Sequence, residues 1–288
     1  MLALDIDGTL ITNDRRLTLE TCRAIQAAQR RGVLVTLSTG RNFYSARNYA
    51  QKLDIELPLI TANGAMIRRP NGEIIQESLL DRDSVAQLIA EMDQAGLLVE
   101  AYHRDGVHLT GSLYELTKIM CGEKLCPRQL FYIWREYRLT NLKRTTRLAQ
   151  QVAQGELAAH KLFSSGEEEK LYRFQARARQ LGQVVEYYPG GFKNRMYLEV
   201  MAPGVSKGMA LKQLAHHLGV PMSQVVAVGD NLNDTEMIKA AGLGVAMGNG
   251  HKELRAMADH VTCTNEEDGV AAVIRDFFLT GEEAQNVI

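Results

Sequence analysis

The sequence has almost no net charge. Its 33 basic and 34 acidic side chains leave a formal charge of -1 at pH 7. A chain without excess charge has no general attraction for nucleic acid or for an anionic membrane. It also has no apolar run near the roughly 20 residues that span a bilayer, and acids at Asp5 and Asp7 stand where a signal peptide would be basic and apolar. We therefore expect a cytoplasmic protein that binds neither nucleic acid nor membrane.

Cysteine is also scarce, and no two of the four cysteines form a CxxC pair. Since four are too few for a disulfide scaffold, we expect reduced thiols at Cys22, Cys121, Cys126 and Cys263. The seven histidines show no HxxxH or HxH spacing, which excludes the simplest metal-binding motifs. We expect His103 and His108 to be solvated.

What the sequence does contain is ordinary globular composition, with 45% hydrophobic and 23% charged residues over 288 positions. Apolar runs and helical spacing alternate at both ends of the chain. Together they predict strands near 2–4, 33–37, 57–61, 224–228 and 243–247, with helices near 17–31, 42–53, 206–218, 235–241, 252–258 and 268–278. This alternation predicts an α/β fold with a doubly wound parallel sheet.

The sequence pattern changes in the middle of the chain, where strand-like and helical runs no longer alternate regularly. We expect a core made of residues 1–80 and 203–288, interrupted by a separate α/β domain at 81–202. Pro203 and Gly204 form the expected return linker.

The first candidate site follows the first strand. Strand alternation places Ile6 on the opposite side from Asp5 and Asp7, so both carboxylates leave the strand end in one direction. Gly8 then allows a tight turn and a close backbone approach to a ligand. Two carboxylates this close repel each other unless a cation lies between them, and Mg²⁺ beside a phosphate is the natural candidate.

Other polar residues are expected at the same edge, because ligands of such sheets bind at the carboxyl ends of the strands. Thr39 and Gly40 follow the second strand, Asn63 the third and Asp230 a later one. Lys207 begins a helix, and its ammonium suits a phosphoryl oxygen or a carboxylate. The predicted site therefore combines acids with phosphate-binding groups.

Four motifs occur along the chain in an order that is typical of one protein superfamily. They are Asp5-Ile-Asp-Gly-Thr-Leu10, Ser38-Thr-Gly-Arg41, Val205-Ser-Lys-Gly208 and Gly229-Asp-Asn-Leu-Asn-Asp234. With them the chain resembles the haloacid dehalogenase (HAD) superfamily of phosphohydrolases, and within it the Cof-type branch with a type IIB cap. The Asn63-Gly64-Ala65 turn and Gly244-Val-Ala-Met-Gly-Asn249 are also typical of that branch, although Gly250 replaces an expected alanine.

The resemblance implies a mechanism. Asp5 would be the nucleophile that forms an aspartyl-phosphate, and Asp7 the general acid and then the base. The Asp5 carboxylate, the Asp7 carbonyl and Asp230 would hold Mg²⁺, with Asp234 orienting metal-bound water. The phosphoryl group would contact Thr39, Lys207, Asn233 and the backbone of Ile6 and Gly40, with Asn63 and Arg41 as further substrate-binding candidates.

Some alternatives stay open at this stage. Asn63 could simply turn the chain, Arg41 could brace neighbouring loops, and Asp234 could favour a helix N-terminus. The expected activity is hydrolysis of small phosphomonoesters, such as sugar phosphates, by a monomer or homodimer under a cap that excludes water. A phosphosugar mutase and a weakly active phosphometabolite-binding regulator are the alternatives.

Overall fold

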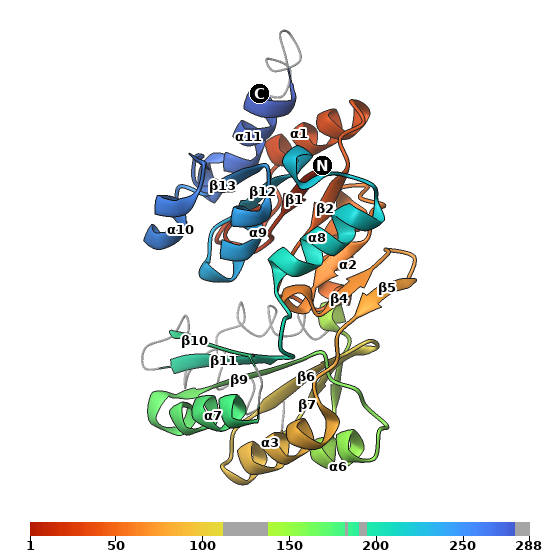
Figure 1. The fold of residues 1–288 in the computed structure, drawn as a ribbon, viewed down its shortest axis with the longest axis vertical. Coiled ribbons are helices and arrows are strands. Elements are labelled where there is room, and N and C mark those ends of the chain that lie inside the picture. The colour runs from red at the N-terminus through yellow and green to blue at the C-terminus, as the bar shows by residue number, and fades with distance from the viewer. Residues whose placement is uncertain (112–137, 182–183, 190–194, 280–288) are drawn as a thin grey trace. The chain divides into compact units, whose positions relative to one another are not determined.

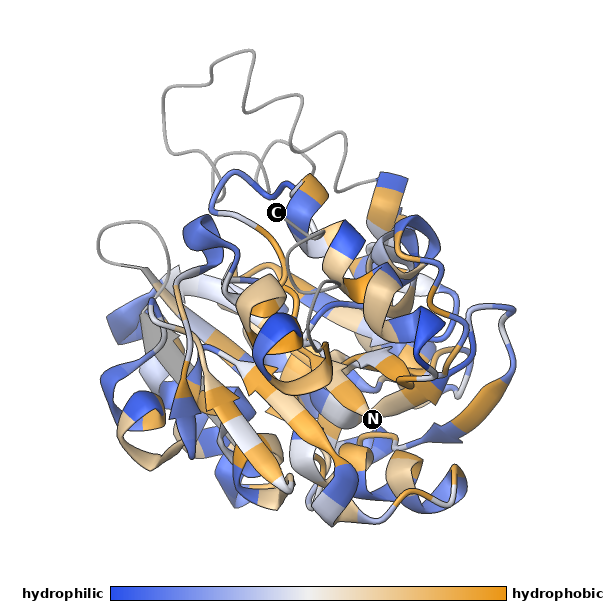
Figure 2. Ribbon diagram, turned by 90° about the horizontal axis from the view of Figure 1, so that it is seen from above, coloured by the Kyte–Doolittle hydropathy of each residue, from blue (hydrophilic) through white to orange (hydrophobic). Residues whose placement is uncertain are grey.

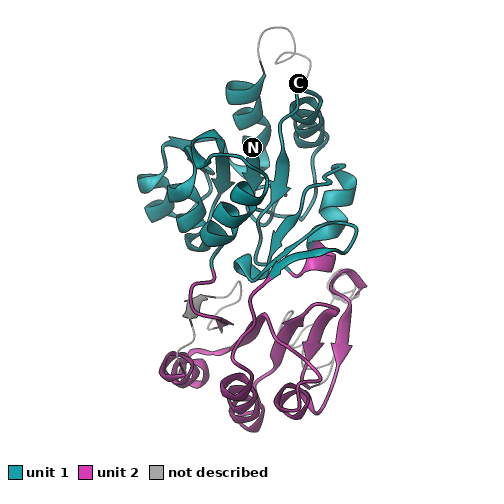
Figure 3. Ribbon diagram, turned by 45° about the vertical axis from the view of Figure 1, so that its right-hand side comes forward, with its two compact units in different colours: residues 1–41, 46–76, 206–288 teal, residues 42–45, 77–205 magenta. Residues whose placement is uncertain are grey.

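The computed structural model describes residues 1–111, 138–181, 184–189 and 195–279. The thiols of Cys121 and Cys126 lie outside these residues, as does most of the segment 112–150. The chain divides into two compact units (Figure 3). The first contains residues 1–41, 46–76 and 206–288, and the second contains 42–45 and 77–205.

The first unit is built on a five-stranded sheet in the order β14-β13-β12-β1-β2, in which the strands pair in parallel. Its strands are β1 (Leu2–Leu4), β2 (Val35–Leu37), β12 (Val226–Gly229), β13 (Leu243–Ala246) and β14 (His260–Val261). Its helices are α1 (Leu19–Arg30), α8 (Lys207–His217), α9 (Thr235–Ala240), α10 (Lys252–Met257), α11 (Gly269–Phe278) and all but the first three residues of α2 (Phe43–Lys52) (Figure 1). The parallel sheet with its helices confirms the predicted fold class.

Local sequence explains the first helix. Thr18 has extended backbone angles, and its side chain accepts a hydrogen bond from the Thr21 amide, which caps α1 as predicted. Ala24, Ile25 and Ala28 then repeat at helical spacing and are fully buried. Figure 2 shows the same pattern more widely, with hydrophobic residues along the strands and both kinds of residue along the helices.

The third predicted strand departs from the expected parallel arrangement. β3 (Leu59–Thr61) meets β2 at one parallel bridge, Ser38 with Ile60, and otherwise pairs antiparallel with β4 (Met66–Arg68). The chain reverses because Ala62 and Asn63 take positive φ angles of 52° and 56°. A three-stranded sheet β3-β4-β5 results, with β5 at Ile74–Glu77.

The second unit has a six-stranded sheet in the order β10-β11-β9-β6-β7-β8. The strands are β6 (Val99–His103), β7 (Gly106–Leu109), β8 (Leu142–Arg144), β9 (Lys161–Glu167), β10 (Val184–Pro189) and β11 (Arg195–Met201). Helices α3 (Arg82–Gln94), α6 (Leu148–Ala153) and α7 (Glu168–Gln180) share a hydrophobic core with this sheet. In the described ranges no helix has the length and apolarity needed to cross a membrane.

Candidate active site

Three of the predicted site residues lie at the carboxyl ends of three neighbouring strands. β1 lies between β12 and β2, so Asp5, Asp230 and Thr39 follow adjacent strands (Figure 1). The Asp5 amide donates to the Val228 carbonyl at 3.0 Å and extends the sheet by one step. Asp5 is 4% exposed. A buried carboxylate at this edge needs positive partners, because burial alone disfavours its charge.

Lys207 supplies that partner. Its Nζ lies 2.7 Å from Asp5 Oδ1 and 2.7 Å from Asp234 Oδ1, and its side chain is almost completely buried. Burial lowers the pKa of Lys207, but the charges of Asp234 and Asp5 outweigh this effect and raise it above the ordinary value. Lys207 is therefore a permanent positive charge beside the predicted nucleophile.

Close packing fixes the position of that lysine at the start of α8. Ser206 caps the helix by accepting a hydrogen bond from the Met209 amide. A Cβ at Gly208 would lie 2.5 Å from the Glu236 carbonyl carbon, and one at Gly64 would lie 2.2 Å from the Ser206 oxygen. Only glycine allows these backbones to approach so closely.

Asp230 contacts the turn that follows Asp7. Its Oδ1 accepts a hydrogen bond from the Thr9 hydroxyl at 3.0 Å. Gly8 has a φ of 77°, and a Cβ there would lie 2.3 Å from Asp230 Oδ2. The Gly8 carbonyl in turn accepts a hydrogen bond from the Asn249 side chain at 2.8 Å. The glycine thus lets the turn lie directly against the carboxylate.

Asp234 is completely buried, and both of its oxygens are engaged. Oδ1 bonds Lys207, and Oδ2 accepts the amides of Asp230 and Asn231, each at 3.0 Å. Asp234 also completes a capping box with Asn231, so the structural role left open in the sequence is present. Its contacts hold Lys207 and the Asp230 loop in place.

The charges of this cluster favour a divalent cation. Asp5, Asp230 and Asp234 each offer a carboxylate oxygen, and these atoms lie within 4.8 Å of one another. Burial and the neighbouring acids raise the pKa of Asp5 well above its usual range, although Lys207 opposes the shift. Burial and the charge of Asp234 raise the pKa of Asp230 to about 7. One ammonium does not balance three carboxylates, and oxygen donors suit a hard cation such as Mg²⁺.

Asp7 is held differently. The Arg41 Nε and Nη2 atoms each lie 2.6 Å from one Asp7 oxygen, which makes a bidentate pair. Burial raises the pKa of Asp7, but the hydrogen bonds and charge of Arg41 outweigh burial and lower it. Arg41, a candidate for substrate binding or for bracing loops, therefore contacts the predicted acid–base residue, a pairing that the sequence did not predict.

The remaining predicted residues line the same loops. Thr39 is buried, and its hydroxyl accepts the Arg41 amide at 3.2 Å. Asn63 turns the chain in the left-handed region, and its Oδ1 accepts a hydrogen bond from the Asn233 side chain at 3.1 Å. A Cβ at Gly40 would lie 2.7 Å from that same oxygen. Asn63 therefore both turns the chain and joins these loops.

Ile6 belongs to the loop that carries Asp7. Ile6 is fully buried, and its carbonyl accepts the Leu10 amide at 3.0 Å, which closes the loop carrying Asp7. The sequence reasoning missed the contacts of Thr9 and Asn249 at this loop. Both residues belong to motifs that were noticed, and a hydroxyl or amide directly after DxDG or GVAMG was the available signal.

Comparisons with known proteins agree with the motifs. The model of the family described as haloacid dehalogenase-like hydrolase matches residues 2–274. A relative from Bacillus subtilis, 5-amino-6-(5-phospho-D-ribitylamino)uracil phosphatase YcsE, is 30% identical over 286 residues, covering 97% of this chain and 96% of its own. The HMP-PP phosphatase of Cronobacter sakazakii is 33% identical over 264 residues, covering 90% and 88%.

Solved structures agree as well. A haloacid dehalogenase-like hydrolase from B. subtilis superposes with a TM-score of 0.81 at 27% identity, covering 96% of this chain and 99% of its own. The resemblance drawn from the four motifs is thereby confirmed. The chain belongs to the haloacid dehalogenase-like hydrolases and is a phosphoric monoester hydrolase of their Cof-type branch.

Proposed function

We propose that this phosphatase hydrolyses small phosphomonoesters, such as sugar phosphates, in a Mg²⁺-dependent reaction through an aspartyl-phosphate on Asp5. The observation that carries the proposal is the setting of Asp5. This buried carboxylate is bonded by Lys207 at one oxygen and lies beside Asp230 and Asp234. A nucleophile for phosphoryl transfer needs positive charge beside it, because an anionic group must approach an anionic ester; Lys207 and a cation held by the acids would supply that charge.

Each residue then has a chemical task. Asp5 attacks phosphorus and forms an acyl phosphate, while Lys207, Thr39 and the backbone of Ile6 and Gly40 hold the phosphoryl oxygens. Mg²⁺, held by the Asp5 carboxylate, the Asp7 carbonyl and Asp230, would supply the charge that offsets repulsion between these anions. Asn233 and Asn63 support the phosphate-binding loops.

Asp7 serves both halves of the reaction. It protonates the leaving alkoxide, and it then takes a proton from the water that attacks the acyl phosphate. Arg41 favours the ionised form of Asp7, which is the form that acts as a base. Protonation of the leaving group requires the pair with Arg41 to open, because a carboxylate bonded at both oxygens by a guanidinium has no proton to donate. Arg41 is then available to contact the substrate.

Asp234 supports the metal site without ligating it. Both of its oxygens already accept hydrogen bonds, so its contribution is to orient Lys207, the Asp230 loop and metal-bound water. We also propose that the chain consists of a core at 1–80 and 203–288 and an inserted α/β domain at 81–202. We also propose a cytoplasmic monomer or homodimer with no nucleic-acid or membrane partner.

The names of the relatives support the proposed substrate class. Three of those compared, all from B. subtilis, are named for 5-amino-6-(5-phospho-D-ribitylamino)uracil. Others are named HMP-PP phosphatases. These are names of small phosphorylated metabolites, so the first panel contains sugar phosphates, sugar-alcohol phosphates and heterocycle-bearing phosphates.

The test is phosphate release from this panel with and without Mg²⁺, using the intact protein, an Asp5→Asn variant and an Asp276→Asn control. Asp276 is an exposed acid on α11, so its substitution changes charge by the same amount away from the site. We expect Mg²⁺-dependent release that only Asp5→Asn abolishes. If the folded, Mg²⁺-loaded protein releases no phosphate from a broad panel, the proposed reaction on small phosphomonoesters is refuted, and the mutase and binding alternatives are tested next.

A further inference from the structure

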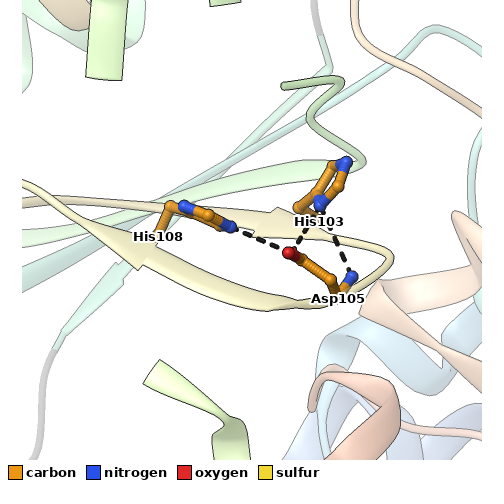
Figure 4. A group of neighbouring side chains, drawn as sticks. All are labelled: His103, Asp105 and His108. Atoms are coloured by element: carbon orange, nitrogen blue, oxygen red, sulfur yellow. Dashed lines mark hydrogen bonds and ion pairs between the residues drawn. The ribbon is translucent and has the colours of Figure 1, made fainter. Parts of the chain in front are cut away.

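A second cluster of polar side chains lies on the β6–β7 hairpin of the second unit. Figure 4 shows His103, Asp105 and His108 directed toward one another across this hairpin. In the antiparallel register His103 pairs with Gly106 and His108 pairs with Ala101. The two histidines therefore occupy diagonal positions on one face of the ribbon. Asp105 belongs to the two-residue turn between the strands and reaches back over that face.

The contacts converge on a single oxygen. Asp105 Oδ1 lies 2.5 Å from His103 Nδ1 and 2.9 Å from His108 Nε2. The two rings meet edge to face, with centroids 5.6 Å apart. The expectation of solvated histidines was wrong for His108, which is 7% exposed because β7 is an inner strand of the sheet.

Neighbouring residues hold the turn and its carboxylate in this position. Lys143 on β8 forms an ion pair with Asp105 Oδ2, so Oδ1 is the oxygen that faces the imidazoles. The Asn141 side chain donates to the Asp105 carbonyl at 2.6 Å. A Cβ at Gly106 would lie 2.2 Å from the Asn141 oxygen. The hairpin tip is therefore built against the start of β8, rather than left as a free loop.

We propose that His103, Asp105 and His108 form a binding site for a divalent first-row transition-metal ion of the zinc type. Two imidazole nitrogens and one carboxylate oxygen are typical ligands of such ions, with water or another group in the remaining position. Among the described residues, only this group and the Asp5 cluster bring three metal-binding side chains so close together. The phosphatase reaction proposed for the Asp5 cluster uses none of these three residues.

The distances require only a small adjustment. Ligands of a tetrahedral zinc ion, each about 2.1 Å from the metal, lie about 3.4 Å from one another. The two nitrogens are 2.5 and 2.9 Å from the Asp105 oxygen. Each nitrogen would move away from the Asp105 oxygen by less than about 1 Å when the metal replaces the hydrogen bonds. The Asp105 side chain is 40% exposed, which leaves a path for the ion to enter.

The proposed site is chemically distinct from the carboxylate cluster. The Asp5 group offers only oxygen ligands, which suit Mg²⁺, whereas imidazole nitrogen favours Zn²⁺, Co²⁺, Ni²⁺ and Cu²⁺. A metal bound here would link both strands of one hairpin through three side chains. We therefore expect it to stabilise the folded protein, because an ion that binds only the folded state shifts the unfolding equilibrium.

Hydrogen bonds alone would also hold these three side chains together, and metal affinity separates the two cases. The test is a titration of the full-length protein with Co²⁺ in the presence of excess Mg²⁺, followed by visible absorption and calorimetry. The variants are His103→Gln with His108→Gln, the single change Asp105→Asn, Asp230→Asn in the carboxylate cluster, and a control with His216→Gln and His217→Gln. The control histidines are exposed on α8.

We expect one Co²⁺ ion to bind with the d–d bands of nitrogen ligation. The double His103/His108 variant should lose at least about 100-fold in affinity, while Asp230→Asn and the α8 control should retain the bands. Circular dichroism shows whether each variant is folded, and phosphate release without Co²⁺ is a second check for the variants outside the carboxylate cluster. Asp105→Asn, which keeps both imidazoles, should weaken binding without unfolding the hairpin.

Two results would overturn the proposal. One is an absence of Co²⁺ bands in the intact protein at millimolar Co²⁺. The other is bands that survive the double histidine change or disappear with Asp230→Asn, which would place the ion in the carboxylate cluster. Neither result bears on the proposed phosphatase reaction, because that reaction is tested by Asp5→Asn in Mg²⁺ alone.

Discussion

Replacing Gly8 by alanine should disable the catalytic site while leaving the fold intact. Gly8 has a φ of 77°, which costs an alanine about 1–2 kcal/mol. The new methyl group would also lie 2.3 Å from Asp230 Oδ2, where an ordinary contact begins at 3.4 Å. The Asp230 carboxylate must therefore move by about 1 Å, and a displacement of that size at a reacting centre costs about 100-fold in rate.

Gly32 provides a matched control. Its φ is 79°, and a Cβ there meets nothing within 4 Å. Gly32→Ala therefore has the same backbone cost of about 1–2 kcal/mol, with no clash. Both variants should lose a few degrees in Tm, because 1 kcal/mol corresponds to about 2–4 °C in a domain of this size.

The assay is steady-state phosphate release at several Mg²⁺ concentrations, beside thermal unfolding of each variant. Gly8→Ala should show kcat about 100-fold lower and should need a higher Mg²⁺ concentration for half-maximal activity. Gly32→Ala should keep the intact protein's kcat. The reasoning is refuted if Gly8→Ala keeps its turnover within threefold, or if Gly32→Ala loses as much activity as Gly8→Ala.

Four further results are expected. Lys207→Met should destabilise the protein by about 3–5 kcal/mol in urea titrations without Mg²⁺, because it leaves buried carboxylates without their cation; a loss below 1 kcal/mol would contradict this. Arg41→Met should raise the pKa of the Asp7 carboxyl followed by carbon-13 NMR, because Arg41 lowers it; an unchanged titration would show that Arg41 has no such effect. Since the pKa of Asp230 is raised to about 7, Mg²⁺ binding should release a proton and tighten as pH rises from 6 to 8; calorimetric heats independent of the buffer's ionisation enthalpy would argue against it. Burial lowers the pKa of His160, so the unfolded chain binds protons first as pH falls below about 6.5, and stability should decrease there; His160→Gln should flatten that dependence in denaturation midpoints.

The strands and helices of the first unit were largely predictable from sequence, and the reason is local. β1 and β12 are short apolar runs that end abruptly in acids, and α1 has both a capping threonine and a buried face at helical spacing. Such signals need no knowledge of distant residues. β3 was placed less well, because its partner depends on the turn at Ala62 and Asn63. Asn63 and Gly64 are residues that tolerate a positive φ, but the positive φ of Ala62 is not encoded by any common residue pattern.

In the candidate site, too, some features follow from local sequence signals and others depend on contacts between distant residues. The edge at which Asp5, Thr39 and Asp230 gather follows from strand order alone, since parallel strands end together. The pair between Arg41 and Asp7 does not follow from strand order, because it depends on which rotamers two side chains adopt across a loop. The sequence therefore left Arg41 divided between substrate binding and bracing.

The histidine cluster shows why register matters more than spacing in a β ribbon. His103 and His108 are five residues apart, a separation that places two side chains on different faces of a helix or of a single strand. They share a face only because a two-residue turn pairs His103 with Gly106. A slip of one residue in that pairing would send one histidine to the opposite face, so a sequence search for HxxxH or HxH spacing cannot find the site.

The hydrogen bonds of each acid distinguish those that can bind a metal from those that orient other groups. Asp234 has one oxygen on Lys207 and the other on two amides, so a metal would have to break an existing bond to reach it. Asp5 bonds Lys207 through Oδ1, and among the described residues no hydrogen bond reaches its Oδ2. Because Asp5 keeps one oxygen available at the strand end, it can serve as nucleophile and ligand, whereas Asp234 can only hold others in place. Asp105 also has both oxygens bonded, but the two imidazoles on its Oδ1 are themselves metal ligands, so an ion between them would replace those hydrogen bonds with bonds to the same three side chains.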